Sequence, residues 1–493
     1  MKKNSFVLYA GILTGLLSVG ALTGCNNNSR KATDEEIRIC VYNGGYGTAW
    51  IQALAEEYEE KTGVKVIWKA DQSILDRIQD QLENGADYDL YLSHGINWQS
   101  YAASGLLENL DDLYESTVEG TDGKTFAERC LEENLIYSKT EGEKEGEEHY
   151  YKVNYTQGAG GLIYNIDLFE EQGWSVPQTY AELQTLCQTI VDADITVGAR
   201  DKLVPIAWSG AERQYYWDYI VFEWWAQLAG LDKVADVIKY MGPDSEGNLT
   251  RYSNGYEMYN PTTYYAEFKQ AYQMWYDLIQ GHKSYSMSGS AGASLLDAQS
   301  AFASGKAAMI PYAQWAKYEI TNGVGADKLD FDIAMMKTPK VSASSQEVNY
   351  LVGYGDSIVM PSFNYVNKEG AKDFLRYMAT YDACKTFVDK AEGAFLAFDY
   401  SDVDLGELLD DTYTKSIYDK LTECESFTLA STNPITYWTT DEVMPWFSND
   451  YYYAAAMTGE SGSDPTSVGN TMYNAAKTSW KSLLMQAGLP YND

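Results

Sequence analysis

The order of segments near the start of the chain most constrains its fold, because short β-rich runs alternate there with helical patterns. Ile37–Tyr42, Val64–Trp68 and Asp89–Leu92 carry the β-branched, aromatic and aliphatic residues that favour buried strands. Residues 50–61 and 73–82 place apolar side chains on one helical face. Because parallel strands are joined by crossover helices, this order predicts a parallel, doubly wound α/β sheet.

A second β/α alternation begins near residue 155. The Gly-rich stretch Gly158–Gly161 precedes a strand at Leu162–Tyr164, and Pro177 opens a helix that continues through Ile190. The 493 residues are enough for two or three domains. We therefore expect two α/β lobes, the second of which starts at about residue 155.

Two loops follow the expected strands of the first lobe. Ligands of open α/β sheets bind beyond the carboxyl ends of the strands, which places Asn43–Thr48 and Ser93–Gln99 at a ligand site. Glycines in the first loop let the backbone approach a ligand closely, although a tight turn alone would also explain them.

The N-terminus is typical of an export signal. Met1-Lys2-Lys3 is followed by an apolar stretch, and Leu22-Thr23-Gly24-Cys25 resembles the bacterial lipobox, in which the cysteine is lipidated and becomes the first residue. We expect a lipoprotein signal peptide at 1–24 and a flexible tether at 25–36. The lipid on Cys25 would anchor the protein to the outer face of a cytoplasmic membrane, most simply in a Gram-positive cell. The alternatives are a plain signal peptide and a buried cysteine.

Charge and ring content narrow the class of partner. The formal net charge of −35 repels phosphate backbones and argues against a nucleic-acid binder. The chain has 42 Tyr, 14 Phe and 13 Trp, so many rings carry a polar edge. This excess of Tyr over Phe fits either a Tyr-rich surface or a binding site lined by aromatic side chains.

Catalytic and redox motifs are missing from the sequence. There is no HExxH, no GxSxG and no P-loop, and only three His occur. The five Cys besides Cys25 form no CxxC pair, so we expect mostly buried free thiols, with room for one disulfide. These observations favour a binding protein without cofactor or metal. Because the chain has 71 acidic residues, the sequence leaves open a carboxylate pair for glycoside hydrolysis.

Several blocks resemble the extracellular solute-binding protein family one of bacterial ABC importers, which includes maltose-binding protein. The blocks follow the family order from about residue 37 to 485, and they are Asp89–Leu92 with Tyr101–Leu107, Gly161–Gly173 with Pro177, Phe302–Trp315, Asn349–Pro361 and Lys368–Tyr377. The sequence departs from the family pattern at Tyr180, where Trp is common, and at Ala313-Gln314, which replaces the usual Gly before Trp315.

The resemblance implies a type II periplasmic-binding-protein-like fold, with two doubly wound α/β lobes joined by a hinge that the chain crosses about three times. The N-terminal lobe would comprise residues 37–154 and 355–400, and the C-terminal lobe 155–354 and 401–493. The ligand would lie between the lobes and favour their closure. The partners would be a membrane permease and a separate ATPase, and the receptor itself a monomer.

A carbohydrate is the ligand that the resemblance and the ring content favour, because sugars need flat rings for their C–H faces and polar groups for their hydroxyls. The expected ligand-binding residues are Tyr46, His94, Asn97, Trp98, Gln157, Trp208, Glu212, Arg213, Tyr216, Trp315, Tyr354, Asp356, Trp438 and Trp446. Rings at helical spacing between residues 215 and 225 must in part be core. So many rings suggest an oligosaccharide, whereas Arg213 or Lys317 would suit an acidic sugar. The rival hypotheses are a polyamine or peptide ligand, and a cell-surface glycoside hydrolase.

Overall fold

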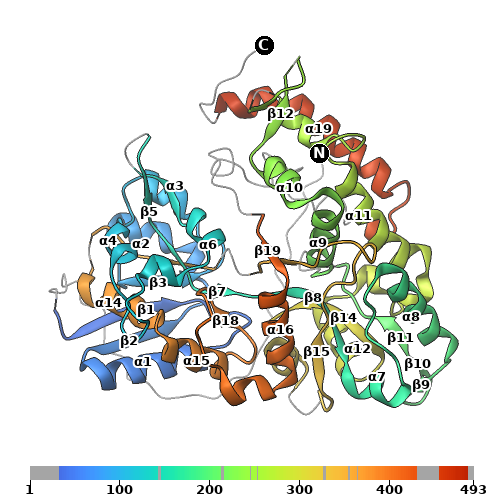
Figure 1. The fold of residues 1–493 in the computed structure, drawn as a ribbon, viewed down its shortest axis with the longest axis horizontal. Helices are drawn as coiled ribbons and strands as arrows, with labels where there is room; N and C mark the ends of the chain where they lie inside the picture. Colours follow the sequence, from blue (N-terminus) through green and yellow to red (C-terminus); the bar gives the residue numbers. More distant parts are fainter. Residues whose placement is uncertain are drawn as a thin grey trace, which may run out of the picture.

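The computed structural model describes residues 33–142, 146–211, 216–244, 246–252, 254–325, 329–352, 356–363, 365–429 and 455–486. It forms two α/β lobes that stand side by side (Figure 1). The expected lipobox, with Cys25, lies outside the described residues.

The sheet of the N-terminal lobe has five strands in the order β2-β1-β3-β17-β6. Its strands are β1 (Glu36–Val41), β2 (Lys65–Ala70), β3 (Leu90–Ser93), β17 (Ser357–Val359) and β6 (Val153–Asn154). The expected parallel arrangement is confirmed for β2-β1-β3, whereas β17 runs antiparallel to both β3 and β6. The sheet is mixed because β17 belongs to a segment that returns from the other lobe.

Helices α1 (Ala49–Thr62) and α2 (Ile78–Asn84) connect the parallel strands. α1 ends as expected at Gly63, which has φ 76°. The single helix expected over 73–82 is instead split into a 3-10 turn, η1 (Ile74–Asp76), and α2, because Arg77 leaves the helical region with φ −127°. Ile74 and Ile78 are both buried, so the apolar period that suggested one helix is preserved across the break.

The sheet of the C-terminal lobe has four strands in the order β11-β14-β8-β15. They are β11 (Val204–Ile206), β14 (Ala307–Ala313), β8 (Gly160–Asn165) and β15 (Ile333–Met335). β11 is parallel to β14, and β8 is antiparallel to both of its neighbours. Its helix α8 (Tyr180–Asp192) begins with a capping box between Thr179 and Glu182.

Rings at helical spacing form much of the C-terminal core. Helix α9 (Trp217–Ala229) buries Trp217, Trp224 and Trp225, which confirms that these rings are core. They pack with α11 (Ala266–Tyr276), and α19 (Pro465–Gln486) lies along the outer side of this lobe (Figure 1). No helix of the described ranges is both long and apolar enough to cross a bilayer.

Further elements complete the two lobes. The helices are α3 (Trp98–Ala103), α4 (Asp111–Glu115), α5 (Phe126–Arg129), α6 (Glu132–Ile136), α7 (Ile166–Gln172), α10 (Leu231–Ile238), α12 (Leu295–Ala303), α13 (Ala316–Val324), α14 (Lys368–Met378) and α15 (Tyr381–Lys390). The short helical turns are η2 (Gly255–Tyr259), η3 (Asp277–Gly281), η4 (Lys283–Tyr285), η5 (Ser290–Gly292) and η6 (Gly406–Asp410). The small hairpins pair β4 (Lys139–Glu141) with β5 (Glu148–Tyr150), β9 (Thr196–Val197) with β10 (Asp201–Lys202), and β12 (Met241–Pro243) with β13 (Leu249–Arg251).

The chain passes between the lobes along a hinge of several segments. The first crossing is β7 (Thr156–Gln157), which leads from one lobe to β8 in the other (Figure 1) and pairs with β18 (Phe395–Leu396). The second runs from β16 (Val348–Tyr350), which pairs with β19 (Glu425–Phe427), to β17. The third leads from β18 to α16 (Thr412–Glu423).

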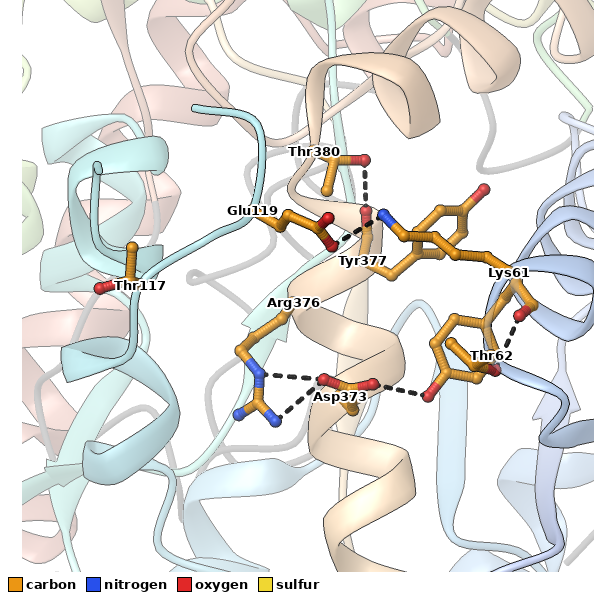
Figure 2. Close-up of a pocket in the computed structure, with 9 residues that line it drawn as sticks. Lys61, Thr62, Thr117, Glu119, Asp373, Arg376, Tyr377 and Thr380 are labelled. Atoms are coloured by element: carbon orange, nitrogen blue, oxygen red, sulfur yellow. Dashed lines mark hydrogen bonds and ion pairs between the residues drawn. The ribbon is translucent and has the colours of Figure 1, made fainter. Parts of the chain in front are cut away.

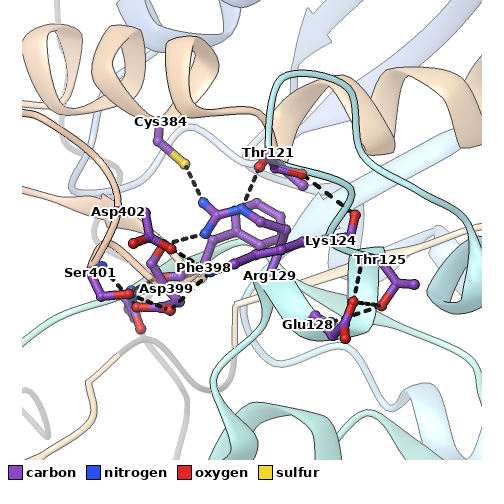
Figure 3. A network of polar contacts seen from close by, with 12 residues as sticks. Thr121, Lys124, Thr125, Glu128, Arg129, Cys384, Phe398, Asp399, Ser401 and Asp402 are labelled. Carbon is purple, nitrogen blue, oxygen red and sulfur yellow. Dashed lines mark hydrogen bonds and ion pairs between the residues drawn. The ribbon is translucent and has the colours of Figure 1, made fainter.

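Arg129 attaches the third crossing to the N-terminal lobe (Figure 3). Its side chain is fully buried, and its guanidinium donates to Asp399 O at 2.5 Å and to Ala379 O at 3.0 Å. It also lies 4.8 Å from the centre of the Tyr381 ring. Because Asp399 follows β18, these contacts fix the point at which the chain leaves the lobe.

The cysteines of the described residues are all free. Cys40, Cys187, Cys384 and Cys424 are buried and Cys130 is half-buried, which confirms the expectation of mostly buried thiols. Burial raises the pKa of the Cys130 thiol to about 12, so this side chain is a thiol rather than a reactive thiolate at neutral pH.

Candidate functional site

A chain of hydrogen bonds joins the two lobes at the hinge. Tyr46, from the loop after β1, donates its hydroxyl to Asp356 Oδ2 at 3.1 Å and accepts from Gln314 Nε2 at 3.0 Å. Thr156 also donates to the Asp356 carboxylate. We call these four residues the Asp356 relay. It connects a loop of the N-terminal lobe, the first two crossings and the end of β14 in the C-terminal lobe.

Asp356 and the nearby Lys152 are both buried. Burial raises the pKa of the Asp356 carboxyl, while the hydroxyl donors and the positive potential of His94 and Lys152 oppose that rise. Lys152 Nζ lies 3.5 Å from Ser357 Oγ and 5.0 Å from the centre of the Trp98 ring. Its burial lowers the pKa of the Lys152 ammonium to about 7, against the attraction of Asp356. Both groups are therefore shifted towards their neutral forms.

A second relay orients the indole of Trp315. The indole Nε1 donates to Tyr216 OH at 3.2 Å, and the Tyr216 hydroxyl donates to Glu319 Oε2 at 3.3 Å. Tyr312 donates to the same carboxylate at 2.5 Å and accepts from Gln299 Nε2 at 2.6 Å. We call this set the Glu319 relay. Burial raises the pKa of the Glu319 carboxyl, and the two phenol donors oppose that rise.

The two relays meet where Tyr46 packs against Trp315. The ring centroids lie 5.8 Å apart with an interplanar angle of 88°, an edge-to-face contact between the lobes. A Cβ at Gly45 would lie 2.7 Å from Trp315 Cγ, and one at Gly47 would lie 2.5 Å from the Tyr318 ring. The loop glycines thus allow the backbone to approach the Trp315 and Tyr318 rings of this chain closely. We had expected these glycines to allow a close approach to a ligand.

Comparison with known proteins identifies the family of this chain. The model of the bacterial extracellular solute-binding protein family matches residues 44–383. The chain belongs to this family. RafE from Streptococcus pneumoniae shares the fold with a TM-score of 0.61 and 17% identity, over 89% of this chain and 96% of RafE. GacH of Streptomyces glaucescens gives a TM-score of 0.61 and 17% identity, over 90% and 98% of the two chains.

One relative is similar in sequence over a shorter stretch. The diacetylchitobiose-binding protein NgcE of Streptomyces coelicolor is 27% identical over 168 residues, which are 33% of this chain and 34% of NgcE. The match therefore spans about a third of the length of this relative. The fold likeness extends over nearly the whole chain, so the resemblance to the family and the type II two-lobed fold are both confirmed.

Four of the expected ligand-binding residues are brought together by the relays: Tyr46, Tyr216, Trp315 and Asp356. Trp315 is half-buried and the other three are buried. Tyr216 precedes α9 with φ 51°, a left-handed conformation that turns its ring towards Tyr312 and Trp315. All four residues lie together at the lobe junction, and their use as ligand contacts stays a prediction.

The other expected residues of the N-terminal lobe occupy different surroundings. His94 is exposed and contacts Tyr42 edge to face at 4.5 Å, and Asn97 is exposed at the start of α3. Trp98 is the first residue of α3 rather than part of the loop, and its ring is buried against Lys152. Gln157 donates to Phe398 O at 2.6 Å, so it connects the first and third crossings.

The remaining expected residues lie in or beyond the C-terminal lobe. Trp208 is buried in its core and donates to Ser286 Oγ at 2.9 Å. Lys317, the candidate for an acidic sugar, pairs with Asp411 at 3.1 Å. Outside the described residues lie Glu212, Arg213, Tyr354, Trp438 and Trp446.

Sequence reasoning expected Asp356 but missed other polar residues of the relays. Gln314 was visible only as a departure from the family pattern, and Glu319 only as an acid one helical turn after Trp315. Thr156 carried no signal of its own, because its partner Asp356 is 200 residues away in sequence. Within the described ranges, no group of three or more His, Cys, Asp or Glu side chains is placed to hold a metal ion.

A small pocket lies elsewhere, between α1 and α14 of the N-terminal lobe, with a volume of about 120 Å³ (Figure 2). Lys61 pairs with Glu119 at 2.8 Å, and Asp373 pairs with Arg376 at 3.1 Å and accepts from Tyr58 OH at 3.0 Å. Because its charged groups satisfy one another, the pocket offers a ligand no uncompensated charge. The lobe junction is the better candidate site.

Proposed function

We propose that this protein is a lipid-anchored extracellular receptor that binds an oligosaccharide between its lobes and delivers it to the permease of an ABC importer. The observation that carries this proposal is the Tyr46–Trp315 ring pair at the lobe junction, backed by two carboxylate-centred relays. Sugar rings stack their C–H faces on aromatic side chains, and their hydroxyls bond to oriented polar groups. No catalytic step is part of this proposal.

The relatives support a saccharide as ligand. NgcE is described as a diacetylchitobiose-binding protein, and RafE has a structure in complex with raffinose. GacH has a structure in complex with acarbose, and another structural neighbour is a chitin oligosaccharide binding protein. Since these proteins differ in the saccharide they hold, they support the class of ligand and leave the particular sugar to experiment.

The anchor is proposed from sequence. Leu22-Thr23-Gly24-Cys25 follows an apolar stretch, and the family is an extracellular one. A lipid on Cys25 would hold the receptor beside its permease on the outer face of a Gram-positive membrane. In such a host, Cys25→Ser should abolish incorporation of a labelled fatty acid and shift the protein out of the lipid-modified membrane fraction. Unchanged labelling of the variant would contradict this part of the proposal.

Calorimetric titration of the full-length chain in detergent tests the ligand. The panel contains raffinose, chitin oligosaccharides, acarbose and, as the rival class, a polyamine and a peptide. We expect binding of one saccharide class, without new reducing ends over time. Binding of the polyamine or peptide alone would contradict the sugar, and accumulating reducing ends would favour a hydrolase.

Trp315→Ala locates the site. Loss of a central aromatic contact costs about 2 kcal/mol, so we expect the Kd to rise roughly thirtyfold. Trp174→Ala is the matched control, because Trp174 is also half-buried but packs edge to face on Phe169 within the C-terminal lobe. If both variants bind like the unchanged protein, the Trp315 ring is not part of the site.

A further inference from the structure

We propose that Gln314 is a positioning residue of the binding site, which with Gly158 fixes the 43–48 loop of the N-terminal lobe against the Trp315 ring. The proposal rests on the proposed function for its meaning, since the residues it positions are the expected ligand contacts. Gln314 itself is fully buried at the end of β14, so it acts through Tyr46 and not through the ligand.

Hydrogen-bond directions fix the orientation of the Gln314 amide. Tyr46 has a single hydroxyl proton, whose two acceptors are the Asp356 carboxylate at 3.1 Å and Thr156 Oγ1 at 3.2 Å. The Tyr46 oxygen is therefore an acceptor towards Gln314, and only the Nε2 end of the amide can donate to it, at 3.0 Å. The carboxylate on the second crossing thus determines, through Tyr46, which way Gln314 points.

Gly158 provides the space that this orientation needs. A Cβ built on Gly158 would lie 0.7 Å from Gln314 Oε1, so the amide occupies the place of a side chain at residue 158. Gly158 belongs to the first crossing, and its carbonyl accepts from Val352 N at 3.1 Å. Its φ lies outside the left-handed region, so close approach, rather than backbone conformation, is what requires a glycine here.

The third crossing holds the backbone of Gln314. Tyr413, on α16, donates its hydroxyl to Gln314 O at 2.8 Å. Gln314 therefore contacts the 43–48 loop at Tyr46, the first crossing at Gly158 and the helix after the third crossing at Tyr413, and it reaches Asp356 of the second crossing only through Tyr46. A residue with a shorter side chain at position 314 would neither reach Tyr46 nor fill the space beside Gly158.

Gln314 should keep the 43–48 loop ordered before a ligand binds. With Gln314 in place, Tyr46 is held and Gly45 lies against Trp315, so the two lobes present their rings together. Without the amide, the Tyr46 hydroxyl keeps only its hydrogen bonds to Asp356 and Thr156, so the loop is less well ordered before the ligand binds. The free energy needed to order the loop on binding makes the binding free energy less favourable, so the affinity is weaker.

The test combines Gln314→Ala, Gly158→Ala and the double variant, all in the full-length chain. In unliganded protein, amide hydrogen exchange of residues 43–48 should become roughly tenfold faster in Gln314→Ala, and the Kd of the saccharide found above should rise by a similar factor. Gly158→Ala should reproduce both effects, because its methyl displaces the amide. The double variant should be no worse than Gln314→Ala, because the methyl then has room.

Gln227→Ala is the matched control: this half-buried side chain accepts from Val341 N at 2.8 Å within the C-terminal lobe. It should leave loop exchange and affinity unchanged. Unchanged loop exchange in Gln314→Ala, a tighter Kd, or additive effects of the two substitutions would overturn the proposal. If the unchanged protein binds no saccharide, the proposed function fails, while the exchange measurements still decide the role of Gln314.

Discussion

Substitution of Lys420 by Met should destabilise the C-terminal lobe strongly, because Lys420 neutralises a buried acid. Lys420 Nζ lies 2.9 Å from Glu223 Oε2, and both side chains are fully buried. Lys420 also donates to Gly160 O and Thr338 Oγ1, while Glu223 Oε1 accepts from Tyr350 N. The pair therefore joins α16 and α9 to the residues where the first crossing enters the lobe and the second leaves it.

The magnitude follows from the burial of both partners. Removal of one partner of a buried ion pair leaves the other charge uncompensated and costs about 3–5 kcal/mol, a large share of the roughly 5–15 kcal/mol that stabilises a domain. Lys420→Met keeps most of the side-chain volume, so the loss reports charge rather than a cavity. In Lys420→Met/Glu223→Gln both charges are gone, and the amide oxygen introduced by Glu223→Gln can still accept from Tyr350 N. We expect this double variant to recover most of the loss.

The pH dependence of the single variant separates charge from packing. Burial raises the pKa of Glu223, and Lys420 opposes that rise. Without Lys420 the pKa of the folded-state carboxyl rises further above its unfolded value, so stability is gained as pH falls through that range and lost as pH rises. Urea unfolding followed by tryptophan emission should show a smaller penalty at pH 5 than at pH 8. A penalty under about 1 kcal/mol at pH 8, or no recovery in the double variant, would refute the reasoning.

Three further outcomes follow from buried groups of the N-terminal lobe. Burial lowers the pKa of Lys152 in the folded protein to about 7. The free energy of unfolding of the unchanged protein should therefore rise from pH 7 to pH 9 more than that of Lys152→Met, because the unfolded chain binds the extra proton. Equal changes of the two unfolding free energies with pH, measured by urea unfolding, would contradict this. Arg129→Met leaves Asp399 O and Ala379 O without their donor, so exchange near residues 395–400 should quicken, with Arg376→Met, at a half-buried arginine paired with Asp373, as the control. A thiol reagent should label Cys384 only after unfolding, because the side chain is buried and its pKa is raised to about 11; labelling of the native protein would argue otherwise.

The fold was predictable from sequence as far as local periodicity reaches. Strands β1 to β3 and helix α1 were expected within one or two residues of their observed bounds, because each shows its own apolar period. The break at Arg77 was missed, since the buried Ile74 and Ile78 keep a helical spacing whether or not the backbone is continuous. β17 lies within the expected Asn349–Pro361 block, but its antiparallel direction was missed because that direction depends on where the chain returns from the other lobe.

The candidate site was predictable only in part. Tyr46 and Trp315 were expected because one lies on a loop after a strand and the other lies in a family block, and the structure brings their rings into contact. Trp98 and Trp208, expected on similar grounds, contact Lys152 and Ser286 instead, because ring type and position in the sequence do not determine which partners a ring meets. Gln314 and Thr156 were missed, since their partners come from distant segments that meet only at the crossings.

The two relays have the same order of groups, and that order limits what Trp315 can offer a sugar. In each relay an amide N–H donates to a phenol, and a carboxylate, buried in the case of Asp356 and half-buried in that of Glu319, accepts from two hydroxyls. Ionised carboxylates only accept, so in their ionised forms Asp356 and Glu319 draw the hydroxyl protons of both relays towards themselves. The indole N–H is already donated to Tyr216, which leaves Trp315 only its ring to present. The relays thus orient a stacking surface and leave recognition of the sugar hydroxyls to other side chains.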